Sequence, residues 1–137
     1  MESYQDDEPY SLRRSMPATI DSVGAARHAV RSFASDLEVD VDGLALAVSE
    51  AVTNVVTHAY PDRSRGTVEL RATATPSAVT LTVRDEGRGL TPDDDAPGAG
   101  LGLVIIHRLA DAVELLDTPD GVVLTMRFPR GGRWSDS

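Results

Sequence analysis

The stretch LALAVSEAVTNVVTHAY, residues 44–60, predicts an apolar helix that carries polar side chains along one side. On a helical wheel at about 100° per residue, its apolar and polar residues fall on opposite stripes. The apolar stripe is Val48, Ala51, Val52, Val55 and Ala59, and the polar stripe is Glu50, Thr53, Asn54 and Thr57. Such a helix needs a second layer of structure that covers the apolar stripe.

Glu50 and Asn54 stand one helical turn apart on the polar stripe. A solvent-exposed helix face normally carries several long charged side chains, yet Glu50 is the only carboxylate in this stretch, which contains no arginine. A carboxamide oxygen is a neutral ligand for Mg²⁺, and a carboxylate can accept a proton from an attacking hydroxyl. Taken alone, the pair is also compatible with an ordinary solvated face.

A second helix and a set of strands surround this stretch. Apolar residues recur at helical spacing from Ile20 to Leu37, where Thr19 or Asp21 can cap the start. Asp42 is placed to cap the helix that runs from Gly43 to Ala59 and that the following Tyr-Pro pair ends. Alternating or turn-bounded segments predict an edge strand at 11–19, a hairpin at 67–75 and 78–85, and a closing hairpin at 112–118 and 122–129.

Early helices followed by hairpins predict an α+β fold, a two-layer sandwich whose mixed, mainly antiparallel sheet has helices on one face. A third helix is expected at 101–111, after a glycine-rich loop at 86–100. We expect one domain at 11–129, between an acidic flexible tail at 1–10 and a flexible tail at 130–137.

Composition excludes several classes of function. The chain has 137 residues, a net charge of -9 and no cysteine, so neither nucleic acid nor anionic lipid is the expected partner. No apolar run is long enough to cross a bilayer and no leader is visible, so a cytoplasmic protein is expected. All 13 lysine-or-arginine positions are arginine, which excludes a P-loop lysine and the strand lysine of ordinary protein kinases.

Two glycine motifs follow the central helix. In VRDEGRGL, residues 83–90, Asp85 ends a strand ahead of Gly87 and Gly89. A carboxylate there can accept a hydrogen bond from an exocyclic amine, although an acidic turn after a strand is common. In PGAGLGL, residues 97–103, the glycines open a helix whose backbone N–H groups could bind phosphate, although a flexible loop would look the same.

The order of these motifs resembles the N, G1 and G2 boxes of the GHKL, or Bergerat-fold, ATP-binding superfamily. SEAVTNVVTHAY, residues 49–60, is similar to the N box of the anti-sigma factor serine/threonine kinases. The resemblance spans about residues 11–129. It implies the Bergerat ATP-binding fold, ATP and Mg²⁺ as cofactors, and possible homodimerisation. The implied partners are a sigma factor and its antagonist, a protein of the STAS type.

The resemblance also implies a role for each matching residue. Glu50 would be the catalytic base, Asn54 the Mg²⁺ ligand, and Asp85 the contact to the adenine amine. The remaining implied cofactor contacts are Gly87 and Gly89 in the adenine pocket, Gly100, Leu101 and Gly102 at the phosphates, and Thr125 near the adenine. His58 matches a histidine common in this group, for which a role in anchoring the helix end is expected.

Three functions are compared. The first is transfer of a phosphoryl group from Mg-ATP to a serine or threonine of an anti-sigma-factor antagonist. The second is a nucleotide-dependent module that sequesters its partner with little or no kinase activity. It is favoured by the three aspartates at 93–95, because negative charge next to a triphosphate is unfavourable. The third, a catalytic fragment of a two-component histidine kinase, lacks the dimerisation helices with a phosphoacceptor histidine.

Overall fold

The computed structural model describes residues 10–59, 66–85, 99–119 and 121–131. Its elements follow one another in the order strand, two helices, two strands, helix and two strands. Their bounds are β1 Tyr10–Pro17, α2 Ile20–Ala34, α3 Val41–Asn54, a π-helical turn Val55–Ala59, β2 Thr67–Ala74, β3 Ala78–Asp85, α4 Ala99–Leu109, β4 Ala112–Thr118 and β5 Gly121–Pro129.

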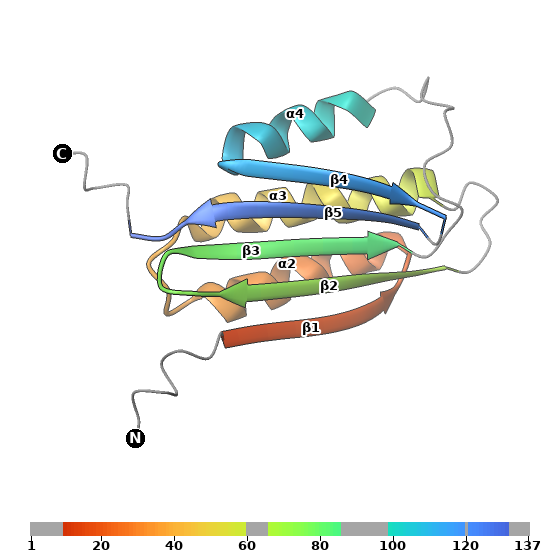
Figure 1. The fold of residues 1–137 in the computed structure, drawn as a ribbon. Coiled ribbons are helices and arrows are strands. Elements are labelled where there is room, and N and C mark those ends of the chain that lie inside the picture. Colours follow the sequence, from red (N-terminus) through yellow and green to blue (C-terminus); the bar gives the residue numbers. More distant parts are fainter. Residues whose placement is uncertain (1–9, 60–65, 86–98, 120, 132–137) are drawn as a thin grey trace.

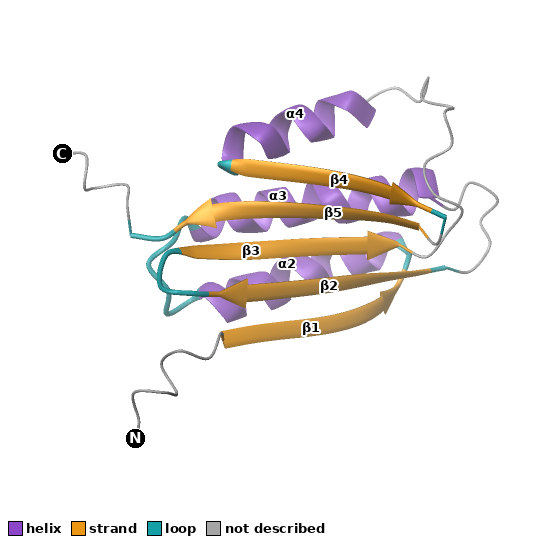
Figure 2. Cartoon of the chain, in the orientation of Figure 1, coloured by secondary structure: helices purple, strands orange, loops and turns teal. Residues whose placement is uncertain are grey.

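The strands form one five-stranded sheet in the order β1-β2-β3-β5-β4. Helices α2 and α3 cross one face of this sheet, and α4 packs against α3 (Figures 1 and 2). The α+β two-layer architecture expected from the sequence is therefore confirmed. All four strand pairings among the described residues are antiparallel, so the mixed component that we predicted is absent from this part of the chain.

The core lies between the sheet and the helices. Every second residue of the central strands is buried there, because successive side chains of a strand point to opposite faces. The apolar stripe of α3 meets them, and its members Val48, Ala51, Val52 and Val55 are buried as predicted. The opposite face of the sheet carries half-buried and exposed polar side chains such as Thr73, Thr80 and Thr82.

Helix α3 begins earlier than the sequence predicted. Its N-cap is Asp40, whose Oδ1 accepts a hydrogen bond of 3.0 Å from the backbone N–H of Gly43. Asp42, our predicted cap, lies in the first turn and forms a 2.9 Å ion pair with Arg31 of α2. The sequence VDVDG offers two aspartates two residues apart, of which the first caps the helix and the second pairs with α2.

The other end of α3 is also different from the prediction. The segment expected as a regular helix to Ala59 changes to π-helical hydrogen bonding at Val55, directly after Asn54. A π turn spans one residue more than an α turn and is frequent next to functional sites. Helix α4 in turn begins at Ala99, two residues ahead of the predicted start.

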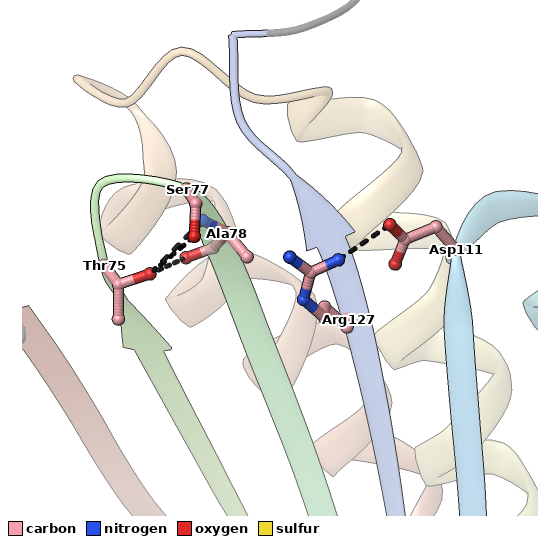
Figure 3. Close-up of polar contacts among 5 residues, drawn as sticks. All are labelled: Thr75, Ser77, Ala78, Asp111 and Arg127. Carbon is pink, nitrogen blue, oxygen red and sulfur yellow. Dashed lines mark hydrogen bonds and ion pairs between the residues drawn. The ribbon is translucent and has the colours of Figure 1, made fainter.

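Two groups of polar contacts hold the loops at one end of the sheet (Figure 3). In the β2–β3 turn, the Thr75 hydroxyl lies 3.5 Å from the Ser77 hydroxyl and donates to the carbonyl of Ala78 at 3.3 Å. Asp111, between α4 and β4, accepts a 2.8 Å hydrogen bond from Arg127 Nη1 of β5. The backbone N–H of Asp111 also donates to the Arg127 carbonyl, so α4 is tied to the sheet where it ends.

The described chain continues two residues past β5. Arg130 donates from its backbone to Ser77 and from its guanidinium to Thr75, and Gly131 donates to the carbonyl of Glu38. These two residues therefore pack on the domain, although the sequence placed the tail from 130 onward; residues 1–9 and 132–137 lie outside the described residues. Among the described helices, none is long and apolar enough to cross a membrane.

Candidate functional site

Four elements meet at one end of the molecule. The C-terminal half of α3, the start of α4, the end of β3 and the start of β5 all lie at that end (Figure 1). They carry the polar pair of α3, the second glycine motif and Asp85. The topology thus brings together segments that lie far apart in the sequence, from the C-terminal half of α3 to the start of β5.

Glu50 and Asn54 face helix α4. A Cβ atom built on Gly102 would lie 3.2 Å from Glu50 Oε1, 3.3 Å from Asn54 Oδ1 and 3.4 Å from Asn54 Nδ2. Both side chains are half-buried, whereas Thr53 and Thr57 on the same predicted stripe are exposed. The polar stripe is therefore divided, and only the carboxylate and the carboxamide turn toward α4.

The backbone of the first turn of α4 completes this contact. Ala99 to Gly102 form that turn, whose N–H groups have no acceptor within the helix. The helix macrodipole adds partial positive charge at the same end. Because residue 102 has no side chain, the α4 backbone at this position lies close to both Glu50 and Asn54.

Ser49 fixes the rotation of α3 next to this pair. Its hydroxyl is buried, donates to the Ala45 carbonyl at 2.8 Å and accepts from Arg27 Nη1 of α2 at 3.1 Å. Since Glu50 follows Ser49, the contact with α2 on one side of α3 helps to direct Glu50 toward α4 on the other.

Asp85 lies at the end of β3 on the helix-covered face of the sheet. Its side chain is only 2% exposed, and its Oδ1 accepts a 3.3 Å hydrogen bond from the backbone N–H of Val122. Next to it, Gly121 has a φ of 139° and lies so close that a Cβ there would be 2.1 Å from the Asp85 carbonyl oxygen. A buried carboxylate at a strand end, held by a backbone donor, can accept a further hydrogen bond from a ligand amine.

Gly121 and Val122 were not among the residues that the sequence singled out. The sequence indicates only a turn ahead of a strand at this point. Their position next to Asp85 results from the antiparallel pairing of β3 with β5, in which Arg84 is opposite Val123. The sequence does contain one signal for Gly121, which is a glycine at the start of a strand, because glycine is the residue that tolerates a positive φ.

Thr125 is not brought to Asp85. It pairs with Thr82 of β3, and paired residues of an antiparallel ladder point to the same face. Asp85 is three residues from Thr82, so its side chain points to the other face. Thr125 therefore lies on the sheet face away from the helices, and Val122 occupies the strand position next to Asp85.

The remaining predicted residues are only partly described. Gly87 and Gly89 lie outside the described residues, as does the aspartate run at 93–95. Gly100 and Leu101 belong to the first turn of α4 by their backbone. His58 lies in the π-helical turn after Asn54, and the other two histidines, His28 and His107, are exposed.

The site has no preformed metal cage in the described part of the chain, where no three histidine, cysteine, aspartate or glutamate residues cluster. Magnesium bound with a nucleotide needs few protein ligands, because phosphates and water supply the others. The Asn54 carboxamide oxygen next to the Gly102 backbone fits that requirement. The donor set therefore suits a magnesium nucleotide.

Comparison with known proteins gives the family. Residues 16–128 match the model of the histidine kinase-like ATPase domain. The chain belongs to this family. The matched region covers all the described strands and helices except the first six residues of β1 and the last residue of β5.

Several known proteins are similar to much of the chain. The serine-protein kinase RsbW of Halalkalibacterium halodurans is 32% identical over 87% of this chain and 83% of its own length. The anti-sigma F factor of Bacillus subtilis is 32% identical over 69% of this chain and 75% of its own. Blue-light-activated histidine kinase 2 of Erythrobacter litoralis is 37% identical over 69% of this chain, which spans 28% of that protein.

A solved structure shares the fold of this chain. The RsbU and RsbW domains of a Mycobacterium tuberculosis protein align with 88% of this chain and 33% of that one. The TM-score is 0.68 at 24% sequence identity, which establishes a shared fold. The match to the family model, together with the RsbW and anti-sigma F relatives, confirms the resemblance to the GHKL superfamily found in the sequence.

Proposed function

We propose that this protein is an ATP-dependent serine/threonine kinase that controls a sigma factor by phosphorylating its antagonist. One observation carries the proposal: the backbone at Gly102 lies against both Glu50 and Asn54, so the start of α4 and the polar pair of α3 form one site. Relatives named serine-protein kinase RsbW and anti-sigma F factor support this activity and these partners.

In the proposed reaction, Glu50 is the general base. Its Oε1 takes the proton from the serine or threonine hydroxyl of the partner, which makes that oxygen a better nucleophile. A positioned base typically contributes about a hundredfold to ten-thousandfold to a rate. Glu50 is half-buried and held next to α4, so its carboxylate is placed without being fully withdrawn from water.

Asn54 and the first turn of α4 bind the phosphate end of the nucleotide. Asn54 Oδ1 would hold Mg²⁺, and the N–H groups of the α4 turn, including those of Gly100, Leu101 and Gly102, would meet phosphate oxygens. The magnesium nucleotide supplies the transferable phosphoryl group and the positive charge that neutralises it. This arrangement needs no lysine, in agreement with a chain that has none.

Asp85 binds the other end of the nucleotide. Its buried carboxylate is an acceptor, and the 6-amino group of adenine is a donor, whereas guanine and hypoxanthine carry a carbonyl at that position. Asp85 therefore favours ATP over GTP. A homodimer remains a prediction from the family resemblance, and a cytoplasmic location remains a prediction from the composition of the chain.

Phosphoryl transfer can be tested directly. The protein is incubated with Mg²⁺ and γ-labelled ATP together with a candidate STAS-type antagonist, and the labelled residue is identified by mass spectrometry. Label on a serine or threonine of the antagonist is expected, with much less label when Asp85→Asn replaces the wild type. A nucleotide-bound protein that holds the antagonist in a stable complex without labelling it would instead show the sequestering module.

A further inference from the structure

The start of β5 lies unusually close to Asp85. Gly121 has a φ of 139°, in the region that favours glycine. A Cβ at this position would lie 2.1 Å from the Asp85 carbonyl oxygen and 3.0 Å from Asp85 Oδ1. No side chain fits in that space, so only glycine lets β5 begin directly against the carboxylate.

This approach has a chemical consequence for Asp85. It brings the backbone N–H of Val122 within 3.3 Å of Asp85 Oδ1, at a point where both side chains are buried. A hydrogen bond to a buried carboxylate fixes its orientation and offsets the loss of water. The donor is a main-chain group, so its position depends on the path of the backbone through Gly121.

We propose that Gly121 is a positioning residue for base recognition: it sets the orientation of the Asp85 carboxylate through the Val122 N–H and thereby the preference for a 6-aminopurine. This inference rests on the proposed binding of adenine by Asp85. A carboxylate accepts hydrogen bonds best near its own plane, so its orientation determines where it can accept a bond from the amine. The Val122 N–H helps to set that orientation. A shift of β5 at Gly121 should therefore affect the base more than the phosphates.

The test compares ATP with ITP, which differ at the purine 6-position, where ITP carries a carbonyl in place of the amine. Affinities of both nucleotides are measured by calorimetry for wild type, Gly121→Ala and Gly131→Ala. Gly131 is a matched control, because it is the other described glycine with positive φ, at 61°, and its added Cβ would meet Glu38 and not Asp85. Thermal unfolding of each variant measures its loss of stability separately from any change in nucleotide preference.

Both variants are expected to unfold at lower temperature than wild type. Only Gly121→Ala should lower the ratio of ATP to ITP affinity, by about tenfold or more, because a site that binds an amine discriminates strongly against its absence. An equal loss of ATP and ITP affinity in Gly121→Ala, or an unchanged ratio, would overturn the inference. Failure of the wild type to bind either nucleotide would instead overturn the proposed function.

If Gly121→Ala does not fold, the wild type provides the second measurement. The amide resonance of Val122 reports on the Asp85 carboxylate that its proton contacts. Saturating ATP should shift this resonance clearly more than saturating ITP does, because only ATP adds an amine to Asp85. Equal shifts with the two nucleotides would contradict a link between the β5 backbone and base recognition.

Discussion

Glu50 is the residue on which the proposed chemistry depends most. Glu50→Gln keeps the size of the side chain but cannot accept the hydroxyl proton, so phosphorylation of the antagonist should fall about a hundredfold or more. ATP affinity should stay within about twofold of wild type, because the base is not a nucleotide ligand. Glu114→Gln, an exposed carboxylate of β4, is the control. Equal rates in Glu50→Gln and wild type would remove Glu50 from the mechanism.

Substitution of Gly102 is expected to change the activity of the protein much more than its stability. Alanine has a higher helix propensity than glycine by about 1 kcal/mol, so Gly102→Ala should not lower the unfolding temperature much. Its methyl group would lie 3.2 Å from Glu50 Oε1 and 3.3 Å from Asn54 Oδ1, closer than these groups accept without moving. We expect kcat/KM to fall about tenfold or more, since small displacements of reacting groups strongly reduce the catalytic rate.

Gly24→Ala is the matched control for Gly102→Ala. Gly24 lies within α2, where an added Cβ would meet only Arg27 Nη2 at an ordinary distance of 3.8 Å. This variant should gain up to about 1 kcal/mol of stability with unchanged kinase activity. A Gly102→Ala protein that is fully active would show that α4 does not need to approach the polar pair this closely.

At the residue scale, the sequence predicted which residues share one helix face, but it did not predict which residues from distant segments contact them. Glu50 and Asn54 could be paired because both lie on one helix, where spacing determines direction. The contact of Val122 with Asp85 could not be predicted, since it depends on the strand register between residues that are 37 positions apart in the sequence. The face on which Thr125 lies could not be predicted for the same reason, because a shift of the register by one residue moves a strand side chain to the other face.

At the scale of elements, the N-terminus of α3 gives a stability prediction. Asp40 caps this helix through the Gly43 N–H, so Asp40→Ala should lower the free energy of unfolding by about 0.5–2 kcal/mol. Asp42→Ala is the control, because it removes only an exposed ion pair with Arg31, and such pairs contribute about 0–1 kcal/mol. Urea unfolding of both variants measures the difference. A larger loss in Asp42→Ala would mean that Asp42 is the effective cap.

Most elements were predictable because their periodicity is local. The strands at β2 and β3 alternate cleanly, and the helices have continuous apolar stripes. The π-helical turn after Asn54 was not predictable, because the residues of that turn fit an α-helix equally well and only hydrogen bonding distinguishes the two. That this turn directly follows Asn54, the proposed Mg²⁺ ligand, could therefore be seen only in the structure.

At the scale of the whole molecule, one acidic side chain links stability to pH. The hydrogen bond from Arg13 Nε to Glu69 Oε2, at 2.8 Å, lowers the pKa of Glu69, and the nearby charges of Arg71 and Arg84 add to this effect. A carboxylate with a lowered folded-state pKa stabilises the protein above its unfolded-state pKa. That contribution is lost as the pH falls through the lowered value.

Arg13→Met tests this link. Removal of the main cause of the shift should cost about 0.2–1 kcal/mol near neutral pH. This difference from wild type should shrink below the ordinary pKa of 4.5 and disappear once the pH is below the lowered pKa of Glu69 in the folded protein. Arg14→Met is the control, since the Arg14 guanidinium donates only to the Arg13 carbonyl at 3.1 Å among the described contacts. A difference that persists unchanged in acid would attribute the effect of Arg13 to packing.

The central claim is that α3 and α4 together bind a magnesium nucleotide. Calorimetric titration of ATP with and without Mg²⁺, into wild type, Asn54→Ala and the exposed neighbour control Thr53→Ala, tests it most directly. Mg²⁺ should raise the ATP affinity of wild type and Thr53→Ala, and most of this gain should be lost in Asn54→Ala. Wild type that binds no ATP, or an Asn54→Ala protein with an undiminished response to Mg²⁺, would contradict the account.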